Sequence, residues 1–207
     1  MKTWLITLTV AAAFVYGPAQ AAAAAKVGDA KAGEAKSAAC IACHGPMGNS
    51  VVPMWPKTAG QHSEYIAKQL ADFKAGNRKN EQMTPQAMAL GDQDLADLAA
   101  YFSSQQQSPG IPGTDPNGLG ERLFRGGNAA SGVPACSGCH GGQGLGMGLA
   151  RFPRISGQHA QYVEGTLKNF RDGARANDPN SMMRGVAVHM TDAEIAAVAQ
   201  YLQGVNP

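Results

Sequence analysis

Two segments in each half of the chain carry apolar residues at the three- and four-residue spacing of an amphipathic helix. The first pair covers 65–75 and 162–171, with apolar faces formed by Ile66, Leu70 and Phe73 and by Val163, Leu167 and Phe170. The second pair follows Asp92 and Asp192, expected as caps, with apolar faces formed by Leu95, Leu98 and Phe102 and by Ile195, Val198 and Leu202. Further helices are expected over 29–39 and 119–125. No segment alternates like a strand over a useful length, so the pattern predicts an all-α fold with long glycine-rich loops.

The two halves repeat one another in sequence. Segment 60–80 aligns with 157–177, and 83–102 aligns with 183–202, in the same order and about 100 residues later. This period is too long for a solenoid, for which roughly 20–50 residues are usual. We therefore predict two tandem copies of one domain, over 26–107 and 119–207. Residues 108–118 lie in a stretch rich in Ser, Gln, Pro and Gly, which is typical of a linker.

The first 25 residues have the pattern of an export signal. Lys2 supplies a positive start, an apolar run follows over 4–16, and Ala19-Gln20-Ala21 offers a small-x-small cleavage site. The apolar run is too short to span a bilayer comfortably, which takes ~20 residues. We expect a signal peptide over 1–25 with cleavage near 21–25 and a periplasmic mature protein; a retained N-terminal anchor is the alternative.

Composition narrows the classes of partner. The formal net charge is +2 at pH 7, so neither nucleic acid nor an anionic membrane surface is implied as a partner. Aromatic residues make up only 6% of the chain, and 26 residues are glycine. Small domains of this kind build thin cores from side chains alone, and a large buried cofactor would help to fill them.

All four cysteines lie in two Cys-x-x-Cys-His motifs, Cys40, Cys43 and His44 and then Cys136, Cys139 and His140. A redox dithiol would accompany a βαβ pattern, and a zinc site would need its second cysteine pair nearby in the sequence. A disulfide between cysteines with only two residues between them would stabilise the fold little. The motif is instead that of covalent c-type haem attachment, with the histidine as an iron ligand. We therefore predict two haem c groups.

The repeat also selects candidates for the other axial ligand. Met83 and Met183 are the only methionines in equivalent positions, each ahead of the last helix of its half. A core role is the usual alternative for methionine. His62 and His159, both in a Gly-Gln-His sequence, are alternative ligands, although polar contacts near a helix start are expected for them; His189 is expected to be exposed.

A proline lies at a similar distance after each motif histidine. Pro56 and Pro153 follow His44 and His140 by twelve and thirteen residues. A ligating histidine usually donates its second ring N–H to a carbonyl, and in small c-type cytochromes a proline carbonyl at about this distance accepts it. A rigid turn in the loop is compatible with this role.

The sequence resembles the dihaem cytochrome c4 family over essentially the whole mature chain. The shared motifs are CIACHG and CSGCHG, the WPK and FPR segments with their following GQH, LFRGG, and MMRGVA. The resemblance implies two class I cytochrome c domains, each wrapped around one covalently bound haem, with propionates facing each other across the interface. It also implies Met83 and Met183 as axial ligands. The short loop before Met83 departs from the family pattern.

The function hypothesis is an electron-transfer protein, not an enzyme, that carries single electrons in a periplasmic respiratory chain. The implied partners are a cytochrome bc-type or other donor and a haem–copper terminal oxidase as acceptor, met through an apolar rim around the haem edge. Peripheral membrane association stays open. A dihaem cytochrome subunit of a flavocytochrome or other dehydrogenase is the alternative, and a dihaem peroxidase is a third. Three arginines are candidates for contacting propionates: Arg151, Arg154 and Arg184.

The two motifs lead to a direct prediction of haem content. Acid–acetone treatment should leave the colour with the protein, because thioether bonds hold both haems. Mass spectrometry of the chain should show two attached haems. Extraction of either haem, or a mass with only one, would contradict the prediction.

Overall fold

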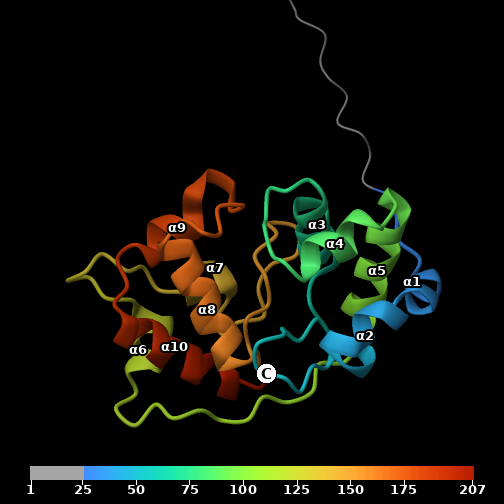
Figure 1. Cartoon of the computed structure of the whole chain (residues 1–207). Helices are drawn as coiled ribbons and strands as arrows, with labels where there is room; N and C mark the ends of the chain where they lie inside the picture. The colour runs from blue at the N-terminus through green and yellow to red at the C-terminus, as the bar shows by residue number, and fades with distance from the viewer. Residues whose placement is uncertain (1–25) are drawn as a thin grey trace, which may run out of the picture.

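The computed structural model describes residues 26–207 and shows two helical halves lying side by side (Figure 1). The first half contains α1 (Ala30–Lys36), α2 (Ala38–His44), η1 (Pro46–Gly48), α3 (Ser63–Lys74), α4 (Met83–Met88) and α5 (Asp92–Ser104). The second contains α6 (Leu119–Gly126), α7 (Ser137–His140), α8 (Ala160–Arg171), η2 (Pro179–Ser181), α9 (Met182–Ala187) and α10 (Asp192–Gly204). Within the described residues, β-structure is limited to two isolated bridges, so the predicted all-α fold is confirmed.

Corresponding helices pack in the same way in the two halves. Helix α5 packs against α1 and α3, and α10 packs against α6 and α8, while α4 lies on α3 and α9 lies on α8. Each half has its own buried cluster, centred on Leu98 and Phe102 in the first and on Phe124, Ile195 and Val198 in the second. Each cluster is small, as expected for domains with few aromatic residues.

Two equivalent glycines let the first helix of each half cross the last one closely. A Cβ atom at Gly33 would lie 2.0 Å from the carbonyl oxygen of Asp97, and one at Gly120 would lie 2.2 Å from that of Ala197. Neither position could hold a side chain without moving a backbone. The crossings fix the helices that lead into the cysteine motifs.

The structure corrects two details of the helix predictions. The helix expected over 29–39 is interrupted at Ser37, which is buried and donates its hydroxyl hydrogen bond to the Glu34 carbonyl at 2.8 Å. The expected caps Asp92 and Asp192 are the first helical residues, and the N-cap positions belong to Gly91 and Thr191. Thr191 forms a capping box with Glu194, whose carboxylate accepts from the Thr191 N–H at 2.8 Å.

The segment between α5 and α6 runs along one edge of the molecule and is tied to both halves (Figure 1). The Ser108 N–H donates to Asn49 at 2.7 Å, and the Gly110 N–H donates to Asn206 at 2.6 Å. These bonds tie the start of the segment to the first half through Asn49 and to the second half through Asn206. The boundaries 26–107, 108–118 and 119–207 remain predictions.

The expected signal peptide over 1–25 lies outside the described residues. Between 26 and 207, no helix is both long and apolar enough to cross a membrane.

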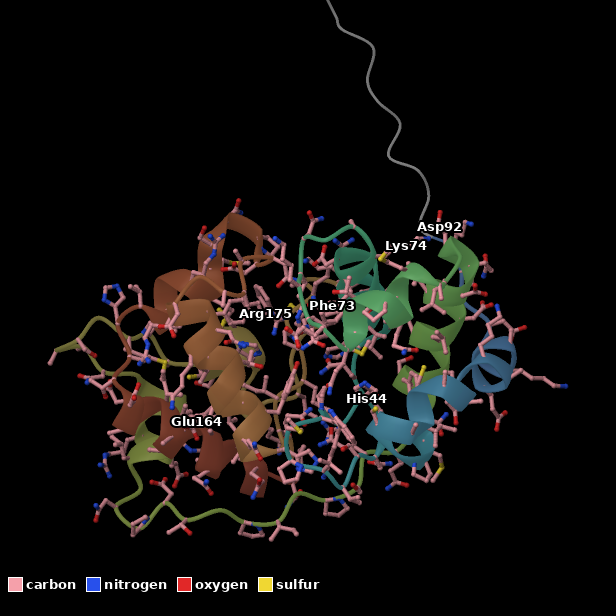
Figure 2. The ribbon with its side chains drawn as sticks, in the orientation of Figure 1. His44, Phe73, Lys74, Asp92, Glu164 and Arg175 are labelled. Carbon is pink, nitrogen blue, oxygen red and sulfur yellow. The ribbon has the colours of Figure 1, made fainter. Side chains whose placement is uncertain are left out.

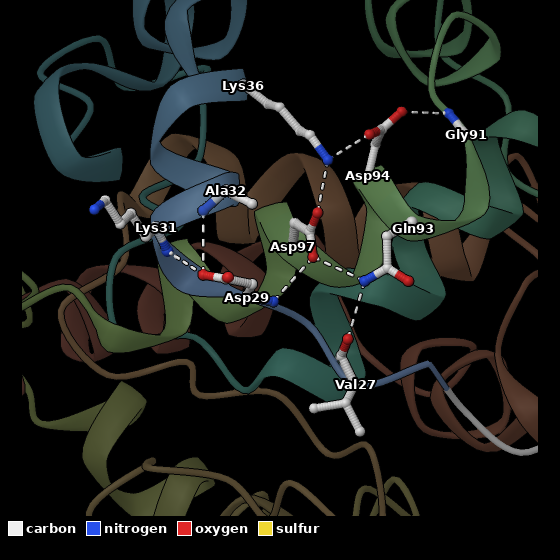
Figure 3. A network of polar contacts seen from close by, with 9 residues as sticks. All are labelled: Val27, Asp29, Lys31, Ala32, Lys36, Gly91, Gln93, Asp94 and Asp97. Carbon is white, nitrogen blue, oxygen red and sulfur yellow. Dashed lines mark hydrogen bonds and ion pairs between the residues drawn. The ribbon is translucent and has the colours of Figure 1, made fainter.

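A network of polar contacts joins α1 to α5 (Figure 3). The buried carboxylate of Asp97 accepts from the Asp29 N–H at 2.9 Å, from Gln93 at 2.9 Å and from the Lys36 ammonium at 2.6 Å. Lys36 also contacts Asp94 at 2.6 Å. The hydrogen bond from Asp29 and then that from Lys36 lower the pKa of Asp97 to about 2, because both favour the charged form.

The Asp97 network predicts a pH-dependent contribution to stability. Because the pKa of Asp97 is lowered, its contribution is present above its ordinary value near 3.8 and is lost as the pH falls through about 2. Asp97→Asn should therefore lower the unfolding midpoint at neutral pH, and the difference from wild type should shrink below pH ~4. Thermal unfolding followed by circular dichroism measures this.

Asp92→Asn is the matched control, since that side chain is 73% exposed and pairs with Lys74 at 3.2 Å. Its midpoint should change little, because exposed ion pairs contribute little to stability. Equal loss in both variants would contradict a special role for Asp97.

Candidate functional site

Each cysteine motif lies on a short helical segment that ends at its histidine. Cys40 and Cys43 are on α2, where a three-residue separation places both sulfurs on one side of the helix, and His44 is its last residue (Figure 2). Cys136 is the N-cap of α7, which contains Cys139 and ends at His140. The same turn of backbone therefore presents two thiols and one imidazole in each half.

All four cysteines are free thiols in the structure. Burial raises the pKa of Cys40, and it raises the pKa of Cys136 to about 11. A redox-active dithiol needs the opposite shift, because the thiolate is the nucleophile. Cys40 and Cys136 are therefore poorly suited to dithiol exchange.

The two motif histidines have matching surroundings. His44 and His140 are each 8% exposed, and their Nδ1 atoms lie 2.8 Å from the Pro56 carbonyl oxygen and 2.9 Å from that of Pro153. A carbonyl oxygen can only accept, so Nδ1 carries the proton and Nε2 of the neutral ring keeps a free lone pair. Burial, opposed by the bond to proline, lowers the pKa of both rings and favours this neutral form. Neutral imidazole is the form that binds iron.

The two candidate methionines occupy similar places. Met83 is the first residue of α4 and Met183 is the second of α9, and both are half-buried. Met183 packs against the same buried cluster as Cys136. Other methionines are exposed or in the core: Met47, Met54, Met88, Met147 and Met182 are more than 40% exposed, whereas Met190 is 4% exposed.

The structure gives the other histidines different surroundings. His62 Nε2 donates to the Leu145 carbonyl at 2.8 Å, and His159 Nε2 donates to the Ser50 carbonyl at 2.9 Å, so both reach across to the opposite half. His189 is exposed. These contacts occupy one ring nitrogen of His62 and of His159 and hold both rings at the contact between the halves.

Polar groups lacking partners gather just after the two prolines. Within residues 26–207, three buried side-chain atoms have no hydrogen-bond partner: Thr58 Oγ1, Arg154 Nε and Ser156 Oγ. Burial lowers the pKa of Lys57, with neighbouring Arg154 adding to the effect, and burial also lowers the pKa of Arg154. The Lys57 ammonium donates to the Ser108 carbonyl at 2.9 Å and to the Pro109 carbonyl at 3.1 Å. The buried Arg154 Nε has no such acceptor, and an anion beside it would supply one. Propionate carboxylates of a haem held by the nearby histidines match that requirement.

The candidate arginines differ in their contacts. Arg184 pairs with Asp178 at 2.8 Å, and Arg151 is exposed, whereas Arg154 is half-buried with an unpaired Nε. Lys57, Gln61 and Gln158 were not predicted from the sequence as site residues. Their positions in the repeated WPK, FPR and GQH segments were the available signal.

Comparisons with known proteins agree with this geometry. The cytochrome c family matches residues 30–106 and 119–206. Cytochrome c4 of Thiocapsa roseopersicina is 60% identical, over 89% of this chain and 97% of its own. The crystal structure of reduced recombinant cytochrome c4 from Pseudomonas stutzeri superposes with a TM-score of 0.84 at 47% identity, covering 87% of this chain and 100% of that one. A protein of Thiomonas intermedia named thiosulfate dehydrogenase electron acceptor is 39% identical, over 98% of this chain and 90% of its own.

The relatives, the repeated helical halves and the two Cys-x-x-Cys-His turns agree on the cofactor, which is two haem c groups. They agree as well on a role in electron transfer. The chain belongs to the cytochrome c4 family of dihaem electron carriers.

Proposed function

We propose that the mature protein carries single electrons in the periplasm and delivers them to a haem–copper terminal oxidase. The observation that carries this is the pair of buried histidines, each hydrogen-bonded to a proline carbonyl beside two free thiols. In this proposal residues 1–25 are removed on export, and the domains 26–107 and 119–207 each hold one haem. We call the group attached to Cys40 and Cys43 haem 1, and the group attached to Cys136 and Cys139 haem 2.

The proposed axial ligands are His44 and Met83 for haem 1 and His140 and Met183 for haem 2. Haem iron with imidazole and thioether ligands changes oxidation state at a high potential with both axial positions filled. The chain's part is to keep the ligands in place, and the bonds to Pro56 and Pro153 fix the orientation of each imidazole ring.

Exposed apolar side chains follow each motif along the chain. Met47, Val51 and Met54 come after His44, and Leu145, Met147 and Leu149 come after His140; all are at least 40% exposed. Small apolar rims of this kind suit the transient contacts of redox partners. The near-balanced charge gives no reason to expect strong electrostatic steering.

Kinetics with an oxidase test the proposed acceptor. The reduced protein should be oxidised rapidly by membranes that contain a haem–copper oxidase, and the reaction should stop with cyanide. Failure of those membranes to oxidise the protein would remove the oxidase as acceptor.

A second candidate is service as the electron acceptor of a dehydrogenase. The similarity to the Thiomonas intermedia protein named thiosulfate dehydrogenase electron acceptor favours it. Co-purification of a catalytic subunit at fixed stoichiometry, or rapid reduction by a thiosulfate dehydrogenase, would support this candidate. The two functions share the same ligands and differ in the partner.

Arg154 is proposed to contact a haem propionate, because its buried Nε lacks a partner. Arg154→Gln should lower the potential of one haem, on the order of tens of millivolts, since a cation near the iron favours the reduced state. Arg184→Gln is the control, because Asp178 already pairs with that guanidinium. Spectroelectrochemical titration measures both, and an unchanged Arg154 variant would refute the contact.

If Met83 and Met183 are the iron ligands, each methionine substitution should change only the haem of its own domain. Met83→Ala and Met183→Ala should each remove half of the weak far-red sulfur-to-iron absorption of the oxidised protein. Each variant should bind carbon monoxide at one haem only and show a lower potential there, because an open position replaces a soft ligand that favours Fe(II). A variant that keeps the full band would show that another residue binds that iron.

A further inference from the structure

The two Gly-Gln-His turns, which precede α3 and α8, lie at the contact between the halves. Gln61 and Gln158 are 9% and 7% exposed, and each reaches into the opposite half. They are equivalent residues of the repeat, so the same contact is made twice in opposite directions. Electron transfer by the family does not by itself explain why a glutamine is buried here.

Each glutamine uses both polar groups of its side-chain amide, the NH2 and the carbonyl oxygen, to hydrogen-bond one backbone residue of the other half. Gln61 Nε2 donates to the Arg154 carbonyl at 2.8 Å, and the Arg154 N–H donates back to Gln61 Oε1 at 2.9 Å. In the other direction, Gln158 Nε2 donates to the Lys57 carbonyl at 2.9 Å and accepts from the Lys57 N–H at 2.9 Å. Of the natural side chains of this length, only the amide supplies a neutral donor and acceptor together.

The N–H that each glutamine accepts belongs to the peptide group that serves the motif histidine. The Pro153 carbonyl accepts from His140 Nδ1 at 2.9 Å, and the N–H on the other side of the same planar peptide is that of Arg154. Likewise, the Pro56 carbonyl accepts from His44 Nδ1 at 2.8 Å, and Lys57 supplies the N–H. One peptide group therefore links a histidine of one half to a glutamine of the other.

The backbone of each glutamine turn is fixed to its own half. The Gly60 N–H donates to the Phe102 carbonyl at 3.0 Å, and the Gly157 N–H donates to the Leu202 carbonyl at 2.9 Å. Both glycines have left-handed φ values, +65° and +66°, which favour glycine. Each turn is thus anchored to the last helix of its own half while its glutamine contacts the other half.

We propose that Gln61 and Gln158 are crossed positioning residues: Gln61 orients the proline peptide that holds His140, and Gln158 orients the one that holds His44. The inference rests on the proposed role of these histidines as haem ligands. Each half thereby sets the axial histidine of the other haem.

The direction of the expected change in haem potential follows from these hydrogen bonds. A hydrogen bond to the peptide N–H polarises the peptide and makes its carbonyl a stronger acceptor for the histidine N–H. A stronger bond at Nδ1 makes the imidazole a more basic ligand, which favours the oxidised iron. Loss of the glutamine should therefore raise the potential of the haem in the opposite domain and leave that of its own domain unchanged.

The experiment uses Gln61→Leu and Gln158→Leu in the full dihaem protein. NMR of the reduced protein with ¹⁵N-labelled histidine reports each Nδ1–H separately. Gln61→Leu should shift the His140 signal and speed its exchange with solvent, leaving His44 unchanged, and Gln158→Leu should do the reverse. Redox titration of either variant should show one of two steps moved to higher potential.

Asn177→Ala is the matched control for a loosened interface. Asn177 donates across the halves to Gln69 at 2.9 Å and to Asp72 at 2.5 Å, without touching either proline peptide. It should leave both histidine signals and both potentials as in wild type. Equal shifts of both histidines in a glutamine variant, a shift in its own half, or no shift at all would overturn the proposal.

Gln61→Glu and Gln158→Glu provide a second route if the leucine variants fail to fold. A carboxyl oxygen still accepts from the peptide N–H, so the opposite haem should keep or lower its potential, and a rise would overturn the proposal. The NMR result does not depend on the methionine ligands. A methionine variant that keeps its far-red band would thus refute the ligand assignment and leave the crossed histidine shifts as a separate result.

Discussion

The hydrogen bond from each motif histidine to a proline carbonyl is the contact on which the rest of each half depends. His44 and His140 are the last residues of α2 and α7, whereas Pro56 and Pro153 lie in irregular loops. The bond therefore joins a short helix to a glycine-rich loop that has little regular structure to hold it. It also determines which ring nitrogen is free, and so leaves a buried neutral imidazole with the lone pair that the proposed iron ligand needs.

Part of the contact between the halves is built on the same loops. The Pro153–Arg154 peptide lies between His140 on one side and Gln61 on the other, and the equivalent peptide in the first half has the same neighbours. His62 adds a bond to the Leu145 carbonyl at 2.8 Å in the loop after the second motif. On the proposed assignment each of these loops holds a haem ligand, and support from two domains would limit the movement of that ligand when the iron changes oxidation state.

The halves share a plan and differ in how their outer helices are held. In the first half, α1 is joined to α5 by the buried carboxylate of Asp97 and by Lys36. Where α6 crosses α10 in the second half, Gly120 approaches Ala197, which has no carboxylate. There Glu194 accepts from Asn128 at 2.7 Å and closes the capping box of α10. Domain repetition therefore preserved the backbone path and let the polar contacts diverge.

Local pattern was enough to predict the longer helices, the tandem repeat and the two haems, whereas the short helices α4, α7 and α9 were not predicted. Helical periodicity depends on neighbours three or four residues apart, and haem attachment needs two thiols and a histidine within one turn. The interruption at Ser37 and the caps at Gly91 and Thr191 were missed. At Ser37 the reason is burial against the rest of the fold, which no local rule reports.

The sequence by itself determined that two copies of a haem-binding domain follow one another, because those signals lie within a few residues of each other. Only the tertiary structure decided that Gln61 meets Arg154 and that Gln158 meets Lys57, since these partners are 93 and 101 residues apart. The same holds for the unpaired Arg154 Nε, whose surroundings come from both halves. Contacts between distant segments depend on how two finished domains pack, and a pattern read along one chain carries no information about that packing.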